Sequence, residues 1–160
     1  MDMPSTLSTR LQYQHKTLID TIDGLTIDQM AKRAIDGKWS IFENIVHLQT
    51  YQHTFSSRVE KILEGNDPFF NTYVAENDPL FIDGCTKTTR EVMHDMISVR
   101  KGIAAKMISL STTDLVKKAS HPVYGTMTLM QWLNFFLLHE AHHFFIIFKL
   151  AALLKKGANS

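Results

Sequence analysis

The chain has 160 residues, 44% of them hydrophobic and 21% charged, which suits one globular domain with a sizeable core. Its formal net charge of +1, without a cluster of lysines and arginines, gives no electrostatic basis for binding nucleic acid. Cys85 is the only cysteine, which excludes an intrachain disulfide and favours a reducing compartment. Because residues 1–10 are polar and lack the apolar core of a secretory signal, we expect a single cytoplasmic domain over residues 1–160.

The N-terminal part of the chain is predicted to form one long helix and one short one. The long helix covers residues 5–24, because apolar residues recur there at helical spacing: Leu7, Leu11, Leu18 and Ile22. Gly24 is a typical helix terminator. A short helical turn over residues 26–33 follows, where Thr26 and Gln29 occupy capping-box positions.

Two further long helices begin at capping boxes of the form Ser/Thr-x-x-Glu. The first box is Ser40 with Glu43, and the apolar stripe that follows it predicts a helix to about residue 65. The second box is Thr88 with Glu91, at the start of a helix that runs to about residue 110.

The C-terminal helix is predicted from about residue 128 to 155, with Thr128 and Gln131 at its start. Its most apolar part, residues 129–154, is interrupted by glutamine, asparagine, glutamate, lysine and histidines. It is therefore a poor membrane span and a good buried helix, and no membrane partner is expected.

Strand signals are almost absent, so the predicted fold is all-α, an antiparallel four-helix bundle with long connections. The long connections are residues 66–85, which are rich in phenylalanine, and residues 111–127. Ordered loops of this length are often functional, and the first is expected to cover a pocket.

Residues 138–143 of the last helix read Leu-His-Glu-Ala-His-His. His139 and His143 lie one turn apart on one face, so their imidazoles can bind a single metal ion. His142 falls in the stripe of polar residues that faces solvent. Glu140 projects roughly opposite that stripe, and a buried carboxylate there needs a partner.

Two alternatives for this motif follow from the residues alone. His139, Glu140 and His143 also match the H-E-x-x-H pattern of zinc proteases, but the usual third ligand downstream is missing, since no Asp, Glu, His or Cys follows His143. The histidines could instead be core residues that merely pack. The upstream candidates for a third ligand are His15, His47, His53, His94 and His121, and periodicity does not choose between His47, His53 and His15.

Two segments resemble the DinB-like (YfiT-like, damage-inducible) family of four-helix-bundle proteins. Residues 38–48 read Lys-Trp-Ser-Ile-Phe-Glu-Asn-Ile-Val-His-Leu, like the family's opening motif, and residues 125–132 with 139–143 resemble its ending. The resemblance implies a divalent metal ion, Zn²⁺ or Ni²⁺, held by three histidines, which here are His47, His139 and His143. The chain departs from the family pattern after the last histidine, where Phe-Phe stands in place of Gly-Gln.

The resemblance also implies a function, a metal-dependent enzyme that acts on a small molecule. The family includes thiol transferases and isomerases that use a low-molecular-weight thiol as cosubstrate, and a hydrolase is the variant in which water is activated. We expect Asn44, Tyr51 and Tyr124 to supply polar groups near the metal. Cys85 is the alternative as a catalytic thiol, although a loop-end cysteine without a histidine partner is more often inert. The alternative function is a non-catalytic, stress-related bundle that binds a metal or another ligand.

Two further expectations concern Glu140 and the surface of the last helix. Glu140 is expected either to orient a metal-bound ring such as His47 or to pair with a basic or hydroxyl side chain of another helix. The solvent stripe of this helix carries an apolar patch around His142, formed by Leu138 and Phe145 with Phe135 and Phe148 at its borders. Either the connection of residues 66–85 folds over this patch or the patch is buried in a homodimer, which the family resemblance favours.

Overall fold

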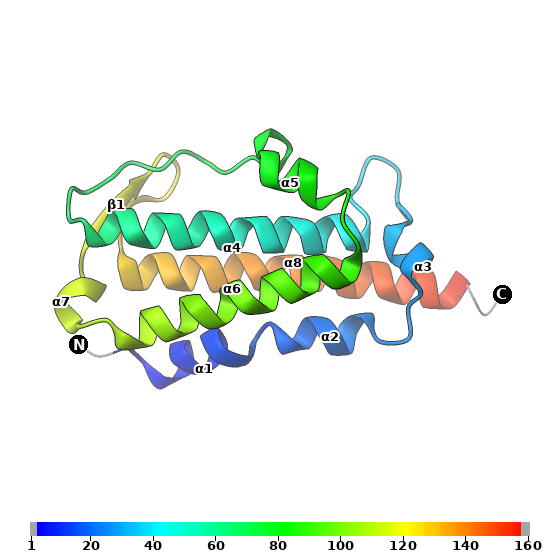
Figure 1. Ribbon diagram of the computed structural model, residues 1–160, viewed down its shortest axis with the longest axis horizontal. Helices are drawn as coiled ribbons and strands as arrows, with labels where there is room; N and C mark the ends of the chain where they lie inside the picture. The colour runs from blue at the N-terminus through cyan, green and yellow to red at the C-terminus, as the bar shows by residue number, and fades with distance from the viewer. Residues whose placement is uncertain (1–2, 158–160) are drawn as a thin grey trace.

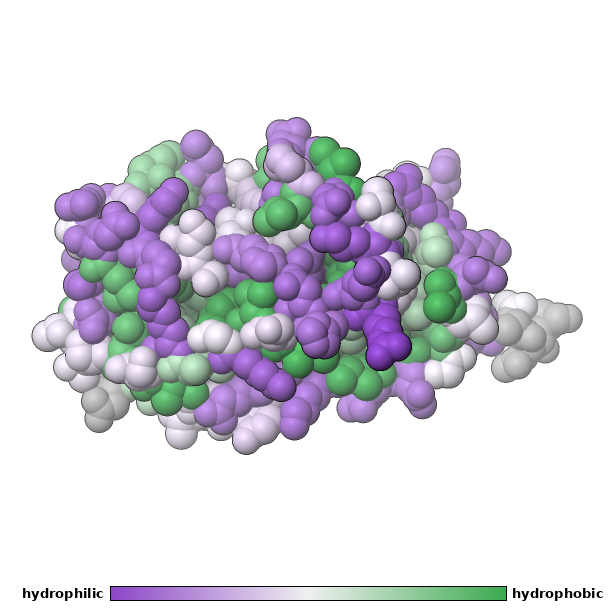
Figure 2. All heavy atoms as spheres, in the orientation of Figure 1, coloured by the Kyte–Doolittle hydropathy of each residue, from purple (hydrophilic) through white to green (hydrophobic). Residues whose placement is uncertain are grey.

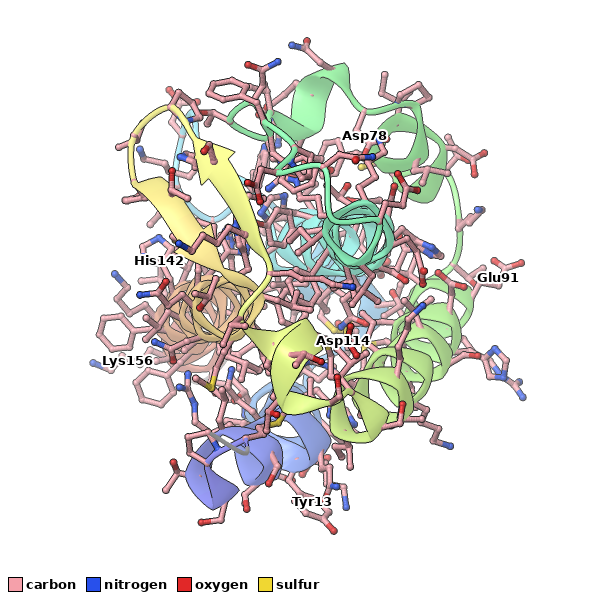
Figure 3. All side chains as sticks on the ribbon, turned by 90° about the vertical axis from the view of Figure 1, so that its left-hand side faces the viewer. Tyr13, Asp78, Glu91, Asp114, His142 and Lys156 are labelled. Carbon is pink, nitrogen blue, oxygen red and sulfur yellow. The ribbon has the colours of Figure 1, made fainter. Side chains whose placement is uncertain are left out.

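Four helical segments lie side by side along the long axis of the molecule in the computed structural model, which describes residues 3–157 (Figure 1). The segments are the pair α1 (Ser5–Tyr13) and α2 (Lys16–Ile22), then α4 (Ile41–Leu63), α6 (Thr89–Ser109) and α8 (Leu129–Gly157). The end-on view of Figure 3 places α4 opposite the α1–α2 pair, with α6 and α8 on the two sides between them. The predicted four-helix bundle is confirmed.

The connection between α4 and α6 sets the directions of the helices. It carries the chain back along the bundle to the end where α4 began, so α4 and α6 run one way while α1, α2 and α8 run the other way (Figure 1). It contains the 3₁₀ turn η1 (Ala75–Asn77) and the short helix α5 (Pro79–Gly84), which were not predicted. Helix α5 lies so close to α4 that a Cβ atom added to Gly84 would meet Cγ1 of Val46 at 2.6 Å.

Capping boxes position the helices as the sequence predicts. In each box the N-cap hydroxyl accepts from the backbone N–H three residues later, and that later side chain accepts from the N-cap N–H, which satisfies donors that the first helical turn leaves open. The boxes begin α3 (Ile27–Ala31), α4 and α6, and the same reciprocal bonds occur at α8: Thr26–Gln29, Ser40–Glu43, Thr88–Glu91 and Thr128–Gln131.

The prediction of one continuous helix over residues 5–24 is wrong, because the helix breaks between α1 and α2. The backbone tightens there, since the N–H of Thr17 bonds to the carbonyl of Gln14 and the N–H of Leu18 to that of His15, three residues back in each case. The Gln14 amide donates to the carbonyl of Leu137 at 2.8 Å, and His15 is buried. The break thus directs the side chains of Gln14 and His15 into the bundle. The apolar residues keep a regular helical spacing across this region, so the sequence shows no sign of the break.

The expectation of almost no strand also needs correction. After α7 (Thr112–Leu115), strands β1 (Lys118–His121) and β2 (Gly125–Thr128) form an antiparallel hairpin. Its turn is held by Nδ1 of His121, which accepts from the backbone N–H of Val123 at 3.1 Å, and Gly125 adopts a φ of 69°. Four-residue strands are too short for alternation to distinguish them from a loop.

Helix α8, with 29 residues, is the longest helix of the bundle. By length and composition alone it could cross a membrane, a property that the central helix of a bundle shares. Here it packs against α4 and α2, and its buried apolar residues are Leu129, Trp132, Leu133, Phe136, Leu137, Phe144, Ile147, Leu150 and Ala151. On the face drawn in Figure 2, hydrophilic residues cover most of the surface with smaller apolar areas between them. The absence of a membrane partner stays a prediction.

Candidate metal centre

Three histidines from two antiparallel helices meet inside the bundle. His47 comes from α4, two turns after its Ser40 cap, and His139 and His143 come from successive turns of α8. The Nε2 atoms of His47 and His139 are 3.0 Å apart, and one ring nitrogen of each histidine lies within 4.8 Å of those of the other two. The structure therefore brings together the three residues that the family resemblance selected.

The ring nitrogens of His143 are oriented by Asn44, one turn before His47. The Asn44 amide nitrogen donates to the carbonyl of Ser40 at 2.8 Å, so its oxygen faces His143 and accepts from Nδ1 at 2.9 Å. This pairing assigns the proton of His143 to Nδ1 and leaves the Nε2 lone pair free. A metal-binding histidine is commonly held in this way by an acceptor on its other nitrogen. The Nδ1 atoms of His47 and His139 are buried and have no protein partner among the described residues.

Burial keeps the three imidazoles neutral. It lowers the pKa of His47, His139 and His143 to about 3 each, and the proximity of the other histidines adds to the effect. Neutral imidazole is the form that binds a metal ion, so protons do not compete for these nitrogens at neutral pH. Three neutral, converging, buried nitrogens fit a divalent ion such as Zn²⁺ or Ni²⁺.

Aromatic rings surround the cluster. The ring of Trp39 lies 5.1 Å from that of His47, Tyr51 lies 4.3 Å from His139, and Tyr73 lies 5.6 Å from His47. The Tyr73 hydroxyl lies 3.1 Å from the Thr50 hydroxyl of α4 and donates to Asp78 at 2.8 Å, so the first of these contacts ties the α4–α6 connection to the helix that carries His47. Part of this connection does cover the cluster, as expected. Tyr73 itself was not predicted as a site residue, because a connection has no periodic pattern from which the direction of a side chain can be predicted.

Glu140 lies on the other side of α8, away from the three histidines. It forms an ion pair with Arg100 of α6 and accepts from Gln14 at 2.9 Å. Of the two expectations for Glu140, pairing with a basic side chain of another helix is confirmed. The zinc-protease alternative fails, because the carboxylate of the H-E-x-x-H pattern contacts none of the three rings, and His47 from upstream completes the cluster.

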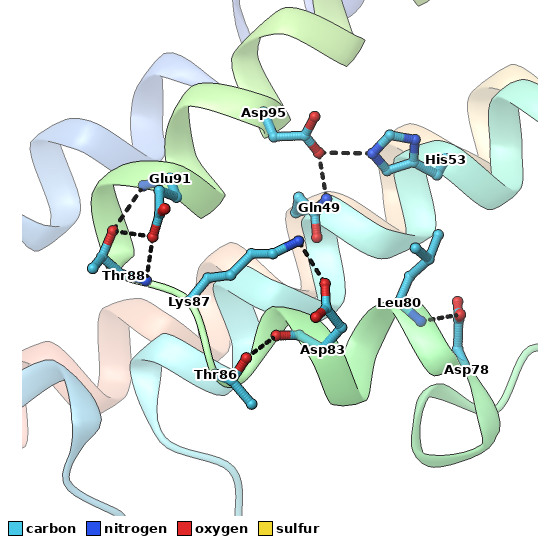
Figure 4. A network of polar contacts seen from close by, with 10 residues as sticks. All are labelled: Gln49, His53, Asp78, Leu80, Asp83, Thr86, Lys87, Thr88, Glu91 and Asp95. Carbon is cyan, nitrogen blue, oxygen red and sulfur yellow. Dashed lines mark hydrogen bonds and ion pairs between the residues drawn. The ribbon is translucent and has the colours of Figure 1, made fainter.

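The other candidate residues lie outside the cluster. Tyr124 is exposed in the hairpin turn and stacks on His121 at 4.9 Å, so its ring contacts do not include the three histidines. His142 is exposed on the outer side of α8, as expected (Figure 3). His53 pairs with Asp95 at 2.7 Å in the surface network of Figure 4. Burial raises the pKa of the Cys85 thiol, which disfavours the thiolate that a catalytic role needs.

Comparison with known proteins identifies the family. Residues 10–147 match the model of the DinB superfamily.

The chain belongs to the DinB superfamily.

One protein of known sequence and two of known structure are also similar to this chain. The uncharacterised protein YuaE of Bacillus subtilis (strain 168) is 26% identical over 138 residues, which cover 76% of this chain and 83% of YuaE. YfiT from Bacillus subtilis, described as a probable metal-dependent hydrolase with an unusual four-helix bundle topology, superposes with a TM-score of 0.79 at 18% identity over 92% of this chain and 85% of its own. The four-helix bundle protein TT2238 superposes with a TM-score of 0.62 at 13% identity over 89% of this chain and 94% of its own. At these identities the two structures establish the shared fold.

Proposed function

We propose that this DinB-superfamily protein is a metal-dependent enzyme in which His47, His139 and His143 bind one Zn²⁺ or Ni²⁺ ion. The observation that carries the proposal is the convergence of three neutral imidazoles, two of them buried and one half-buried, with His143 oriented by Asn44. The fold shared with YfiT, a probable metal-dependent hydrolase, supports it. Three protein ligands leave room for a small molecule at the ion, as in other catalytic sites.

The ion would supply a nucleophile, because coordination lowers the pKa of a bound water or thiol. The protein residues hold the site ready for this chemistry. Asn44 fixes His143, and the rings of Trp39, Tyr51 and Tyr73 form an apolar surround that limits access of bulk water. Glu140 is paired with Arg100 and Gln14 on the other side of α8, so we do not assign it as the general base.

Two reaction classes suit this site: hydrolysis of a small molecule, and transfer of a low-molecular-weight thiol to an electrophile. The description of YfiT as a probable metal-dependent hydrolase favours hydrolysis, whereas the wider family resemblance favours thiol transfer. We propose the cytoplasm as the location, in keeping with the single, free cysteine.

The test is a metal analysis followed by an activity screen. Protein purified without a histidine tag should contain about one divalent ion per chain, which a chelator removes. The loaded protein should then turn over at least one member of a panel of esters, amides, and thiol–electrophile pairs, and the metal-free protein should not. Metal binding without any turnover would support the non-catalytic alternative. Absence of stoichiometric metal would overturn the metal-dependent enzyme and leave only a bundle that binds another ligand.

We also propose that the protein is a homodimer through the apolar patch of α8. The α4–α6 connection does not cover the patch, because Leu138, Phe145 and Phe148 are 54%, 60% and 57% exposed. The alternative of a patch covered by residues 66–85 is therefore wrong. Light scattering at micromolar concentration should give twice the mass of one chain, and Phe145→Glu should halve that mass. A parent protein that is monomeric at all concentrations would exclude the dimer.

A further inference from the structure

A pocket of ≈ 510 Å³ opens beside the histidine cluster, between the start of α4 and the C-terminal half of α8. This volume falls in the range of about 300–1,000 Å³ that is usual for small-molecule sites. The pocket reaches two members of the candidate metal centre, Asn44 and His143, which contact each other at 2.9 Å. His47 and His139 do not line it, so a molecule in the pocket approaches the cluster from the side of His143.

The buried and the exposed parts of the pocket lining differ in character. Asn44, His143 and Leu150 are buried and form its floor, and the apolar rings and chains of Trp39 and Ile146 are partly buried above them. The exposed lining residues include three with a charge: Lys38, Glu76 and Lys149. The pocket is therefore apolar in its body and charged at its rim.

The charge at the rim is positive. Two lysines, Lys38 and Lys149, stand against one glutamate, Glu76, among the residues that line the pocket. Neither Lys38 nor Lys149 forms an ion pair among the described residues, and the ammonium of Lys149 lies 4.7 Å from the centre of the Phe145 ring. Ammonium groups that lack an acidic partner beside an apolar pocket are suited to bind an anionic group of a ligand.

We propose that this pocket binds the substrate, and that the substrate is a small molecule with an apolar body and one anionic group, a carboxylate, sulfonate or phosphate. The anionic group pairs with Lys38 and Lys149 at the rim. The apolar body packs against Trp39 and Ile146, and the far end of the molecule reaches Asn44 and His143. The assignment as substrate site rests on the proposed metal-dependent function, whereas the chemical class of the ligand follows from the lining alone.

The binding test uses octanoate as the probe, with octanamide as its neutral counterpart and octylammonium as its cationic one. Trp39 lines the pocket while Trp132, the other tryptophan, is fully buried in the core, so a change in tryptophan fluorescence that is lost in Trp39→Phe reports on the pocket. Octanoate should bind about tenfold more tightly than octanamide, and octylammonium should bind more weakly than either. Calorimetry on the same samples gives the affinities independently.

Lysine variants locate the anionic group. Lys38→Gln and Lys149→Gln should each weaken octanoate binding about three- to tenfold, the range for a partly desolvated ion pair, and should leave octanamide binding unchanged. Lys155→Gln is the matched control, because Lys155 lies on the same helix but lines a different groove. This control should bind both probes as the parent protein does, and all three variants should still bind the metal.

The outcomes separate this inference from the proposed function. Equal affinity for octanoate and octanamide, preference for octylammonium through Glu76, or unchanged octanoate binding in both lysine variants would each overturn the inference. Lysine-dependent octanoate binding in a protein without metal-dependent turnover would overturn the proposed function and leave the ligand class standing. A metal-dependent activity that favours neutral substrates, and that Lys38→Gln leaves unchanged, would overturn the inference about the ligand and leave the proposed function standing.

Discussion

Helix α8 carries buried polar groups on two of its faces, and the two groups are built differently. Toward α4 it presents His139 and His143, which meet His47. Toward α6 and α1 it presents Glu140, one residue after His139, which forms an ion pair with Arg100. Successive residues of a helix point about 100° apart, so two neighbours in one short motif belong to separate sites.

The difference between the two sites lies in how their polar atoms are satisfied. Both oxygens of Glu140 have protein partners, one in Arg100 and the other in the Gln14 amide, and Glu140 and Arg100 are each 1% exposed. Burial lowers the pKa of Arg100, to about 9, but the guanidinium stays protonated at neutral pH and lies over the Phe136 ring. The Glu140 carboxylate is thus closed off by protein partners, although Nε and Nη1 of Arg100 are buried without a hydrogen-bond partner among the described residues. The imidazole nitrogens of the other site instead converge on one another and suit a cation from outside.

The largest expected effect is on the closed site. Glu140→Ala leaves the Arg100 charge buried without its partner, so it should lower the free energy of unfolding by about 3–5 kcal/mol. Replacing both residues, as Glu140→Leu with Arg100→Met, should recover much of this loss, since the paired charges are removed together. Urea denaturation of the metal-free proteins measures both.

Glu60→Ala is the matched control for this loss. Glu60 forms an exposed ion pair with Lys106, so its removal should cost at most about 1 kcal/mol. If Glu140→Ala costs no more than Glu60→Ala, the carboxylate is not the closed, structural partner described above.

The next largest effect is expected at the site of the three histidines, which we call the open site because its nitrogens suit a cation from outside. His139→Ala should weaken binding of Zn²⁺ or Ni²⁺ at least about 100-fold, beyond the 10–100-fold usual for partners that only orient a ligand. Calorimetric titration of metal into chelator-treated protein measures this. His142→Ala is the control on the same helix, and it should bind metal normally because His142 is exposed on the outer side of α8. The reverse pattern would show that α8 presents a different face to the metal.

The contrast between these sites also shows what could be predicted from sequence. Helical periodicity correctly placed His142 outside and Glu140 inside, and capping boxes placed the starts of α4 and α6. Periodicity did not select His47 over His15 or His53, because all three flank apolar stripes and only the docking of α4 on α8 separates them. The family resemblance supplied that choice. The break at Gln14, the hairpin and Tyr73 were missed, since short strands and connections have no periodic pattern.

A smaller effect is expected at Asn44, which orients one ligand of the open site. Asn44→Leu removes the acceptor for Nδ1 of His143 and should weaken metal binding about 10-fold, at the low end for such partners. Asn44→Asp keeps an acceptor oxygen and should bind metal more tightly than Asn44→Leu. If the two variants have the same metal affinity, the hydrogen bond does not contribute and the substitution acts through packing alone.

The last expected effect is a pH dependence of stability on the side of the closed site. His15 is buried, and burial together with the charge of Arg100 lowers its pKa from 6.5 to about 4. Between these values the unfolded chain binds a proton that the folded chain does not, so the contribution of His15 to stability is complete above pH 6.5 and is lost as the pH falls toward 4. His15→Gln should therefore reduce the slope of the unfolding free energy with pH in this interval, by up to about 1.4 kcal/mol per pH unit for one proton.

Urea denaturation of metal-free protein at pH 7, 6 and 5 measures the slope, and His94→Gln, at an exposed histidine of α6, serves as the control. The buried histidines of the open site contribute to the slope of every variant alike, so a His15→Gln slope equal to that of the parent would mean that His15 takes up its proton in the folded state.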